Sequence, residues 1–239
     1  MIIIPARIGS TRFPNKVMAD IMGTPMVIRT AQAVSAIDDV IIATDSREIV
    51  DIAKKYDIEA VLTSPSHASG TERIHEASVI LGAKEDEIII NVQADEPFLE
   101  EEVVERVRRL IVENSDDESV LACSAFKLIE GPEADDPNIV KVVTDDDGMA
   151  LLFSRAKIPY PRDHHFNTYK GHLGIYGFTA RSLEMYCSLE PCELEHIEKL
   201  EQLRILSHGY RIAMVEVETE SFGIDTPEDL QRALRRHML

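Results

Sequence analysis

The chain has 239 residues and a formal net charge of −18, with 43 Asp and Glu against 25 Lys and Arg. This acidity argues against a protein that binds nucleic acid by broad neutralisation of phosphates, although a small polyanion can still bind where the local charge is positive. The three cysteines show neither a disulfide framework nor zinc-ligand spacing. The opening apolar run is too short for a signal peptide or a membrane span, so we expect a reduced, cytoplasmic enzyme with no membrane partner.

Short apolar runs alternate with amphipathic stretches in the first half. We expect strands over residues 2–4, 40–43, 60–62, 88–92 and 120–124, and helices over 24–35, 46–56, 69–81 and 100–113. This alternation predicts an α/β fold with a mostly parallel twisted sheet and helices on both faces. In such sheets ligands bind beyond the carboxyl ends of the strands.

Helix-start signals accompany several of these segments. Thr24 is the expected N-cap of the first helix, with Pro25 at the first helical position. Asp45 is the favoured N-cap of the second helix, and Ser69 and Glu72 have the spacing of a capping box.

The second half has a different pattern. It predicts a hairpin of residues 139–144 and 149–154, a loop over 155–170, strands over 172–178 and 212–217, and helices over 194–207 and 227–236, the last capped by Thr226. No repeat or flexible linker separates these elements. We therefore expect one domain, residues 1–239, with a β-rich insertion in its second half.

A basic loop follows the first strand. It carries Arg7, Gly9, Ser10, Arg12 and Lys16, and no acidic residue precedes the twentieth position. Small residues let backbone N–H groups approach a phosphate, and the cations supply charge. The loop matches neither the P-loop nor the dinucleotide-binding pattern, so the residues alone leave a solvated surface turn as the alternative.

Two carboxylates follow strand-like segments elsewhere. Asp95 comes after residues 88–92, and Asp225 precedes the last helix. Oxygen ligands at a sheet edge near a phosphate loop suit Mg²⁺, which takes one or two carboxylates together with substrate phosphates. Glu96 and the acidic residues 100–102 are better interpreted as favourable charges at the start of the following helix.

Further candidates are more weakly indicated. Ser69, Gly70 and Arg73 at a helix start could contact a base or ribose. Arg155 is a candidate partner for a carboxylate, and His172 and Tyr176 lie on one face of a strand. Three glycines in a strand-like segment, Gly171, Gly174 and Gly177, are assigned to packing. The adjacent histidines, His164 and His165, are not assigned to a metal site.

Together these segments resemble the 3-deoxy-D-manno-octulosonate cytidylyltransferase family. The matching segments, in family order, are IIIPARIGSTRFPNK, ATD, SGTER, NVQADEPF, NIVKVV, LFSRAKIP, HLGIYGF, LEQLR and GIDTPEDL. One departure stands out, because the family usually has Gly where this chain has Ala94. Ala would be strained there if the position required a positive φ.

The resemblance implies a nucleotide-diphospho-sugar transferase-like fold, Mg²⁺ dependence, a homodimer and a cytoplasmic role in lipopolysaccharide biosynthesis. The implied reaction joins CMP from CTP to the acidic eight-carbon sugar 3-deoxy-D-manno-octulosonate (Kdo) and releases pyrophosphate. The implied roles are catalysis by Arg12, Lys16 and Asp95; nucleotide binding by Arg7, Gly9, Ser10, Lys16, Ser69, Gly70, Arg73 and Gln93; sugar binding by Arg155, His172, Tyr176, Glu201 and Gln202; and metal binding by Asp95 and Asp225.

Two alternatives stay open at this point. One is an enzyme for another acidic sugar, such as an 8-amino analogue of Kdo or a sialic acid. The other is a non-catalytic nucleotide-binding protein on the same fold. The presence of both Asp95 and Asp225 argues against the second, because binding alone would not need both.

Overall fold

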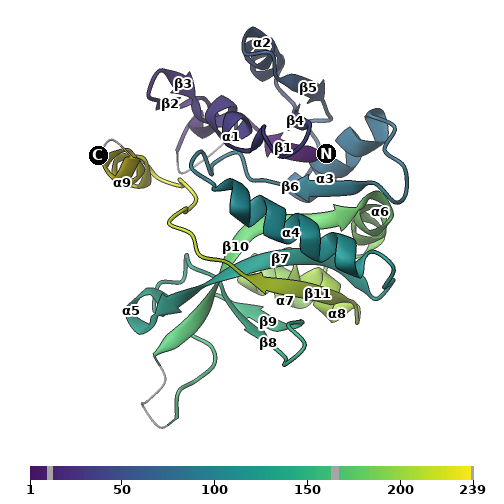
Figure 1. The fold of residues 1–239 in the computed structure, drawn as a ribbon, viewed down its shortest axis with the longest axis vertical. Coiled ribbons are helices and arrows are strands. Elements are labelled where there is room, and N and C mark those ends of the chain that lie inside the picture. The colour runs from purple at the N-terminus through teal and green to yellow at the C-terminus, as the bar shows by residue number, and fades with distance from the viewer. Residues whose placement is uncertain (10–12, 163–166, 238–239) are drawn as a thin grey trace.

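The computed structural model describes residues 1–9, 13–162 and 167–237. Figure 1 shows a twisted sheet with helices on both of its faces. The central strand order is β11-β7-β10-β6-β1-β4-β5. These strands are β1 (Ile2–Ala6), β4 (Val40–Thr44), β5 (Glu59–Leu62), β6 (Ile88–Asn91), β7 (Val120–Glu130), β10 (Thr168–Thr179) and β11 (Arg211–Glu216).

The remaining elements cover this sheet or extend it. The helices are α1 (Met26–Val34), α2 (Arg47–Lys55), α3 (Gly70–Ile80), α4 (Glu101–Asn114), α5 (Gly131–Ala134), α6 (Ala180–Ser188), α7 (Glu193–Glu198), α8 (Leu203–Ser207), α9 (Pro227–His237) and the 3₁₀ turn η1 (Lys16–Met18). The short strands are β2 (Asp20–Ile21), β3 (Thr24–Pro25), β8 (Lys141–Thr144) and β9 (Ala150–Ser154).

The predicted mostly parallel sheet is confirmed. β1 pairs in parallel with β4 and β6, β4 with β5, and β7 with β11. β10 is the exception, since it runs antiparallel to both β6 and β7. The predicted hairpin also forms, because β8 and β9 pair antiparallel and join the sheet through β10.

Residue alternation in β1 divides the core into two layers. Ile2 and Ile4 are buried on one face with apolar residues of α1, α2 and α4. Ile3 is buried on the other face with residues of α3, α6 and α8. Because successive strand side chains point to opposite faces, a three-isoleucine run serves a sheet that is covered on both sides.

Several predicted boundaries are wrong. Thr24 and Pro25 pair with β2, so the first helix begins at Met26 with Pro25 as its N-cap. The expected strand over 120–124 continues to Glu130, because its second half pairs with β10. The expected helix over 194–207 is broken at Lys199, whose φ is 55°.

The capping predictions have mixed outcomes. Ser69 accepts a hydrogen bond from the Glu72 backbone N–H at 3.1 Å, as expected, but the Glu72 carboxylate accepts from the Ala68 N–H, so the capping box is not completed. Thr226 likewise caps the last helix by accepting from the Asp229 N–H. Asp45 does not cap α2: Ser46 takes that role, and Asp45 forms an ion pair with Arg73.

The last helix, α9, lies near α1 and the β2–β3 hairpin (Figure 1). Ile224 and Ala233 are buried in one small cluster with Ile21 and Met26. This cluster brings a carboxyl-terminal segment to the edge of the sheet where β1 ends. Among the helices of the described ranges, none is both long and apolar enough to cross a membrane.

Lys141 anchors the β8–β9 hairpin to its surroundings. Its side chain is fully buried. The ammonium donates to the carbonyl oxygens of Asp136, Ile139 and Arg155 at 2.9, 2.6 and 2.6 Å. Burial lowers the pKa of this ammonium, with the charge of Asp136 opposing the shift.

We predict that Lys141→Met lowers the free energy of unfolding by about 2 kcal/mol or more, because the carbonyl oxygens lose charge-assisted hydrogen bonds. Urea denaturation monitored by circular dichroism measures the change. Lys54→Met, on the exposed surface of α2, is the control and should change stability little. Equal effects of the two substitutions would contradict the anchoring role.

Candidate active site

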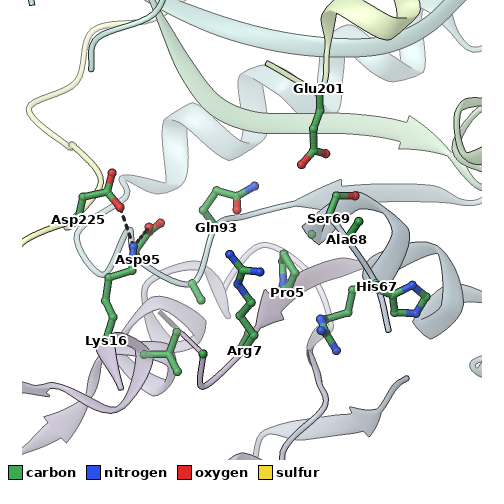
Figure 2. Close-up of a pocket in the computed structure, with 16 residues that line it drawn as sticks. Pro5, Arg7, Lys16, His67, Ala68, Ser69, Gln93, Asp95, Glu201 and Asp225 are labelled. Carbon is green, nitrogen blue, oxygen red and sulfur yellow. Dashed lines mark hydrogen bonds and ion pairs between the residues drawn. The ribbon is translucent and has the colours of Figure 1, made fainter. Parts of the chain in front are cut away.

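A cavity of about 320 Å³ lies at the carboxyl ends of β1 and β6. It brings together most of the residues predicted to bind nucleotide and metal, and Figure 2 shows their side chains converging from both sides. The predicted residues that line it are Arg7, Gly9, Lys16, Ser69, Gly70, Arg73, Gln93, Asp95, Glu201 and Asp225. Ser10 and Arg12 lie outside the described residues, so their predicted roles stay predictions.

Lys16 sits between the two predicted metal carboxylates. Its ammonium lies 2.5 Å from Asp95 Oδ2 and 2.8 Å from Asp225 Oδ1 (Figure 2). Burial favours the neutral amine, but the charges and hydrogen bonds of the two carboxylates outweigh it, so the pKa of Lys16 is raised. Lys16 therefore stays charged, and the pair of carboxylates forms a site that favours a cation.

Hydrogen bonds from backbone N–H groups hold the two segments that carry these carboxylates. The Ile224 N–H donates to the Asp95 carbonyl oxygen at 2.9 Å. On the other side, the Asp225 and Thr226 N–H groups donate to Asp229 Oδ2 at 3.2 and 3.0 Å. Asp229 thus fastens the segment that carries Asp225 to the first turn of α9.

This donor set fits Mg²⁺. Asp95 and Asp225 offer hard oxygen atoms around one positive charge, and Mg²⁺ commonly binds through one or two carboxylates plus substrate phosphates. Within the described part of the chain, no three or more His, Cys, Asp or Glu side chains are grouped so that they could hold a metal ion.

Ala94 is accommodated without strain next to this site. It is not among the described residues with positive φ. Its carbonyl oxygen accepts a hydrogen bond from Thr30 Oγ1 at 3.0 Å. The added methyl group is buried in the core layer that contains α1, so the departure from the family's Gly has no backbone cost.

Glu96 does not lie at the start of a helix, although the sequence had indicated this. It lies before α4 begins and is 8% exposed. Burial, reinforced by the neighbouring Asp95 charge, raises the pKa of its carboxyl to about 8. Glu101 and Glu102 do occupy the first turn of α4, as expected.

Part of the wall of the first cavity is built by α3, through Gly70 and Arg73. The Arg73 guanidinium is buried and donates to Thr63 Oγ1 at 2.7 Å and to Asp45 Oδ2 at 3.1 Å. A Cβ at Gly70 would lie 3.2 Å from the Pro5 side chain, so glycine lets α3 approach β1 closely. Arg73 thus shapes the cavity while its charge is already paired.

His67 is a lining residue that the sequence reasoning missed. Its Nε2 lies 2.5 Å from Glu76 Oε2, which also accepts from the Ser64 N–H. A histidine just before a capped helix carries little sequence signal. Its position depends on a carboxylate two turns into that helix.

A second cavity, of about 190 Å³, adjoins the first. The two share Gly70, Gln93 and Glu201. Tyr176 and Gln202, both predicted to bind sugar, line the second one. Burial raises the pKa of Glu201, and a hydrogen bond from Thr71 at 3.1 Å opposes the shift.

The other two residues predicted to bind sugar do not line either cavity. His172 is half-buried, with Nε2 3.0 Å from Ser124 Oγ, and its ring lies 5.5 Å from that of Tyr176. Burial lowers the pKa of His172 to about 3, so it is neutral. The Arg155 guanidinium donates to the Glu198 and Pro137 carbonyl oxygens. Without a contact to either cavity, their sugar-binding roles stay predictions.

A buried ion pair supports the second cavity from behind. Arg204 Nε and Nη2 lie 2.8 and 2.6 Å from the two oxygens of Glu195. The guanidinium also lies 5.1 Å from the centre of the Tyr186 ring, which lines the cavity. Burial opposes ionisation of Glu195, but Arg204 outweighs it, so the pKa of Glu195 is lowered.

Similarity to known proteins defines the class of enzyme to which the chain belongs. The model of a family described as cytidylyltransferase matches residues 1–212, so the chain is a nucleotidyltransferase. It is 55% identical over 232 residues to the 3-deoxy-manno-octulosonate cytidylyltransferase of Nitratiruptor sp., with 97% of each chain covered. The enzyme of the same name from Wolinella succinogenes is 52% identical, with 98% of each covered.

A solved structure extends this similarity to three dimensions. CMP:2-keto-3-deoxy-manno-octonic acid synthetase in complex with CTP superposes with a TM-score of 0.90 at 34% identity, covering 99% of this chain and 97% of that one. The chain therefore belongs to the 3-deoxy-manno-octulosonate cytidylyltransferase family.

We predict that Glu195→Gln destabilises the protein by about 3 kcal/mol at pH 7, because Arg204 is left buried without its charge partner. The folded pKa of Glu195 is lowered, so its contribution is present above the unfolded value of 4.5 and is lost as the pH falls through the folded pKa.

The free energy of unfolding, measured from pH 7 down to pH 3, tests this. The gap between wild type and Glu195→Gln should shrink below about pH 4.5. Glu193→Gln, exposed on the same helix, is the control. A gap that stays constant with pH would contradict an electrostatic role for Glu195.

Proposed function

We propose that this chain transfers CMP from CTP to the anomeric hydroxyl of Kdo, giving CMP-Kdo and pyrophosphate. The observation that carries the proposal is the pair of adjoining cavities. One has paired carboxylates and cations suited to a metal-bound triphosphate, and the other has polar groups suited to a sugar. The family relationship supports the same reaction, since the relatives compared above carry the corresponding name.

The reaction needs positioning more than covalent help from the protein. The acceptor hydroxyl oxygen bonds to the α-phosphorus while the bond to the pyrophosphate oxygen breaks, and the hydroxyl proton is released. Gly70, Gln93 and Glu201 border both cavities, so both reactants would meet at these residues. Holding two reactants in line removes much of the entropic cost of their encounter.

Charge in the first cavity would be supplied from two sides. Arg7 points toward the centre of the cavity in Figure 2, and Lys16 approaches from the side of Asp95. Both can neutralise phosphate oxygens, and Lys16 can follow the charge that builds up on the departing pyrophosphate. Asp95 and Asp225 would hold Mg²⁺, which when bound supplies charge neutralisation on the triphosphate and acidifies a nearby hydroxyl.

Recognition of the acceptor would come from the second cavity. Tyr176, Glu201 and Gln202 can exchange hydrogen bonds with sugar hydroxyls. Gln93 is oriented between the cavities by its own donation to the Gly174 carbonyl oxygen at 3.2 Å. The cytoplasmic location, the role in lipopolysaccharide biosynthesis and the homodimer are proposed from the family resemblance alone.

Pyrophosphate release over a panel of nucleotides and acidic sugars tests the function. With Mg²⁺, we expect release with CTP and Kdo that exceeds release with other nucleoside triphosphates. Preference for an 8-amino analogue of Kdo or for a sialic acid would instead assign the enzyme to that sugar. Binding of CTP without any release across the panel would identify a non-catalytic protein.

We predict that Asp95→Asn and Asp225→Asn each lower kcat/KM by about a hundredfold or more, because each removes an anionic oxygen from the metal site. Turnover with CTP, Kdo and Mg²⁺ is the measurement, and calorimetric titration of Mg²⁺ into the enzyme with CTP gives a second readout. Asp51→Asn, on the exposed surface of α2, is the control. Near-normal rates in both site variants would refute the assignment.

A further inference from the structure

Asp225 lies near the end of an irregular segment, residues 217–226, which we call the connector. The connector joins β11 to α9 and is the yellow coil between them in Figure 1. In the described part of the chain, residues 218–223 make no backbone-to-backbone hydrogen bond. The path of the connector toward Asp225 is therefore set by side chains that reach it from other elements.

Lys127 on β7 holds the connector against the sheet. Its ammonium donates to the carbonyl oxygens of Thr219 and Ser221 at 3.4 and 3.0 Å. Hydrogen bonds from a charged donor are stronger than those between neutral groups. Ser221 is only 3% exposed, so the connector is packed against the protein at this point. One ammonium thus fixes the connector at two points shortly before Asp225.

Glu100, just before α4, binds the same stretch of the connector. Its carboxylate accepts hydrogen bonds from the Thr219 hydroxyl and from the Glu220 N–H, the latter at 3.1 Å. The Thr219 hydroxyl oxygen in turn accepts from the Ser221 N–H at 2.9 Å. A cation and an anion from two different elements therefore hold adjacent groups of the connector. Neither Lys127 nor Glu100 lines a cavity, so both act on the site only through the connector.

We propose that Lys127 is a positioning residue for Asp225. By anchoring the connector at Thr219 and Ser221, it keeps the Asp225 carboxylate beside Asp95, where both can hold the metal ion. The inference rests on the proposed function, since it requires Asp225 to bind the metal. Mg²⁺ demands near-ideal octahedral geometry, and groups that orient a metal ligand strongly influence metal affinity.

The test is calorimetric titration of CTP into the enzyme, once with Mg²⁺ and once with EDTA. The ratio of the two affinities is the gain that Mg²⁺ provides. We expect Lys127→Met to reduce this gain about tenfold, because the metal loses a correctly placed ligand. The affinity for CTP in EDTA should stay within about twofold of wild type. Thr219→Val, which removes only the hydroxyl bonded to Glu100, should reduce the gain by a smaller factor.

Two further variants separate positioning from general stability. Lys157→Met is the matched control, because Lys157 also donates to a carbonyl oxygen, that of Gly131 at 2.9 Å, and lines neither cavity. It should keep the full gain. If Lys127 acts through Asp225, the double variant of Lys127→Met and Asp225→Asn should have the same gain as Asp225→Asn alone.

Each other outcome overturns a defined statement. An unchanged gain in Lys127→Met, with the gain lost in Asp225→Asn, refutes the role of Lys127 and leaves the proposed function standing. Equal losses of CTP affinity with Mg²⁺ and with EDTA, or additive effects in the double variant, identify a structural residue and also refute that role. A wild-type protein in which Mg²⁺ does not strengthen CTP binding refutes the metal site of the proposed function and this inference with it.

Discussion

The active site depends on the contact between two distant parts of the chain, at which the Ile224 N–H donates to the Asp95 carbonyl oxygen. Lys16 lies 79 residues from Asp95 and 209 residues from Asp225, yet its ammonium bonds to both. Two neighbouring carboxylates repel each other, so a fixed backbone and the Lys16 ammonium between them keep them together. The packing of α9 against β2 and α1 supplies that fixed backbone.

The sheet explains why the polar groups meet at one edge. β1, β4 and β6 run in parallel, so the loops that follow them emerge on the same side. Both faces of these strands are covered by helices, which leaves the strand ends as the place where charged side chains reach a substrate. Lys16 follows β1, and Asp95 follows β6. Their proximity is thus a consequence of strand direction.

The second cavity comes from the antiparallel part of the fold. β10 runs antiparallel to β6 and carries Gly174 and Tyr176 past Gln93, so the second cavity adjoins the first. An interrupted helix completes it, because the break at Lys199 separates α7 from α8 and places Glu201 and Gln202 at the wall. The rings of His172, Tyr176, Phe178 and Tyr186 contact one another in that order, and the last three line the cavity.

The sequence by itself determined the fold class, the central-sheet strands of the first half and most of the residues that line the first cavity, because hydrophobic period and strand-end position are local signals. It did not determine the break at Lys199, the burial of Glu96, the partner of Asp45 or the place of His67. The partners of Asp45 and His67 both lie on α3, 28 and 9 residues along the chain, so contacts between elements set these features. The tertiary structure alone decided that Arg155 and His172 line neither cavity and that Tyr186 lines one, because packing between elements distant in the chain places these side chains and no local pattern records it.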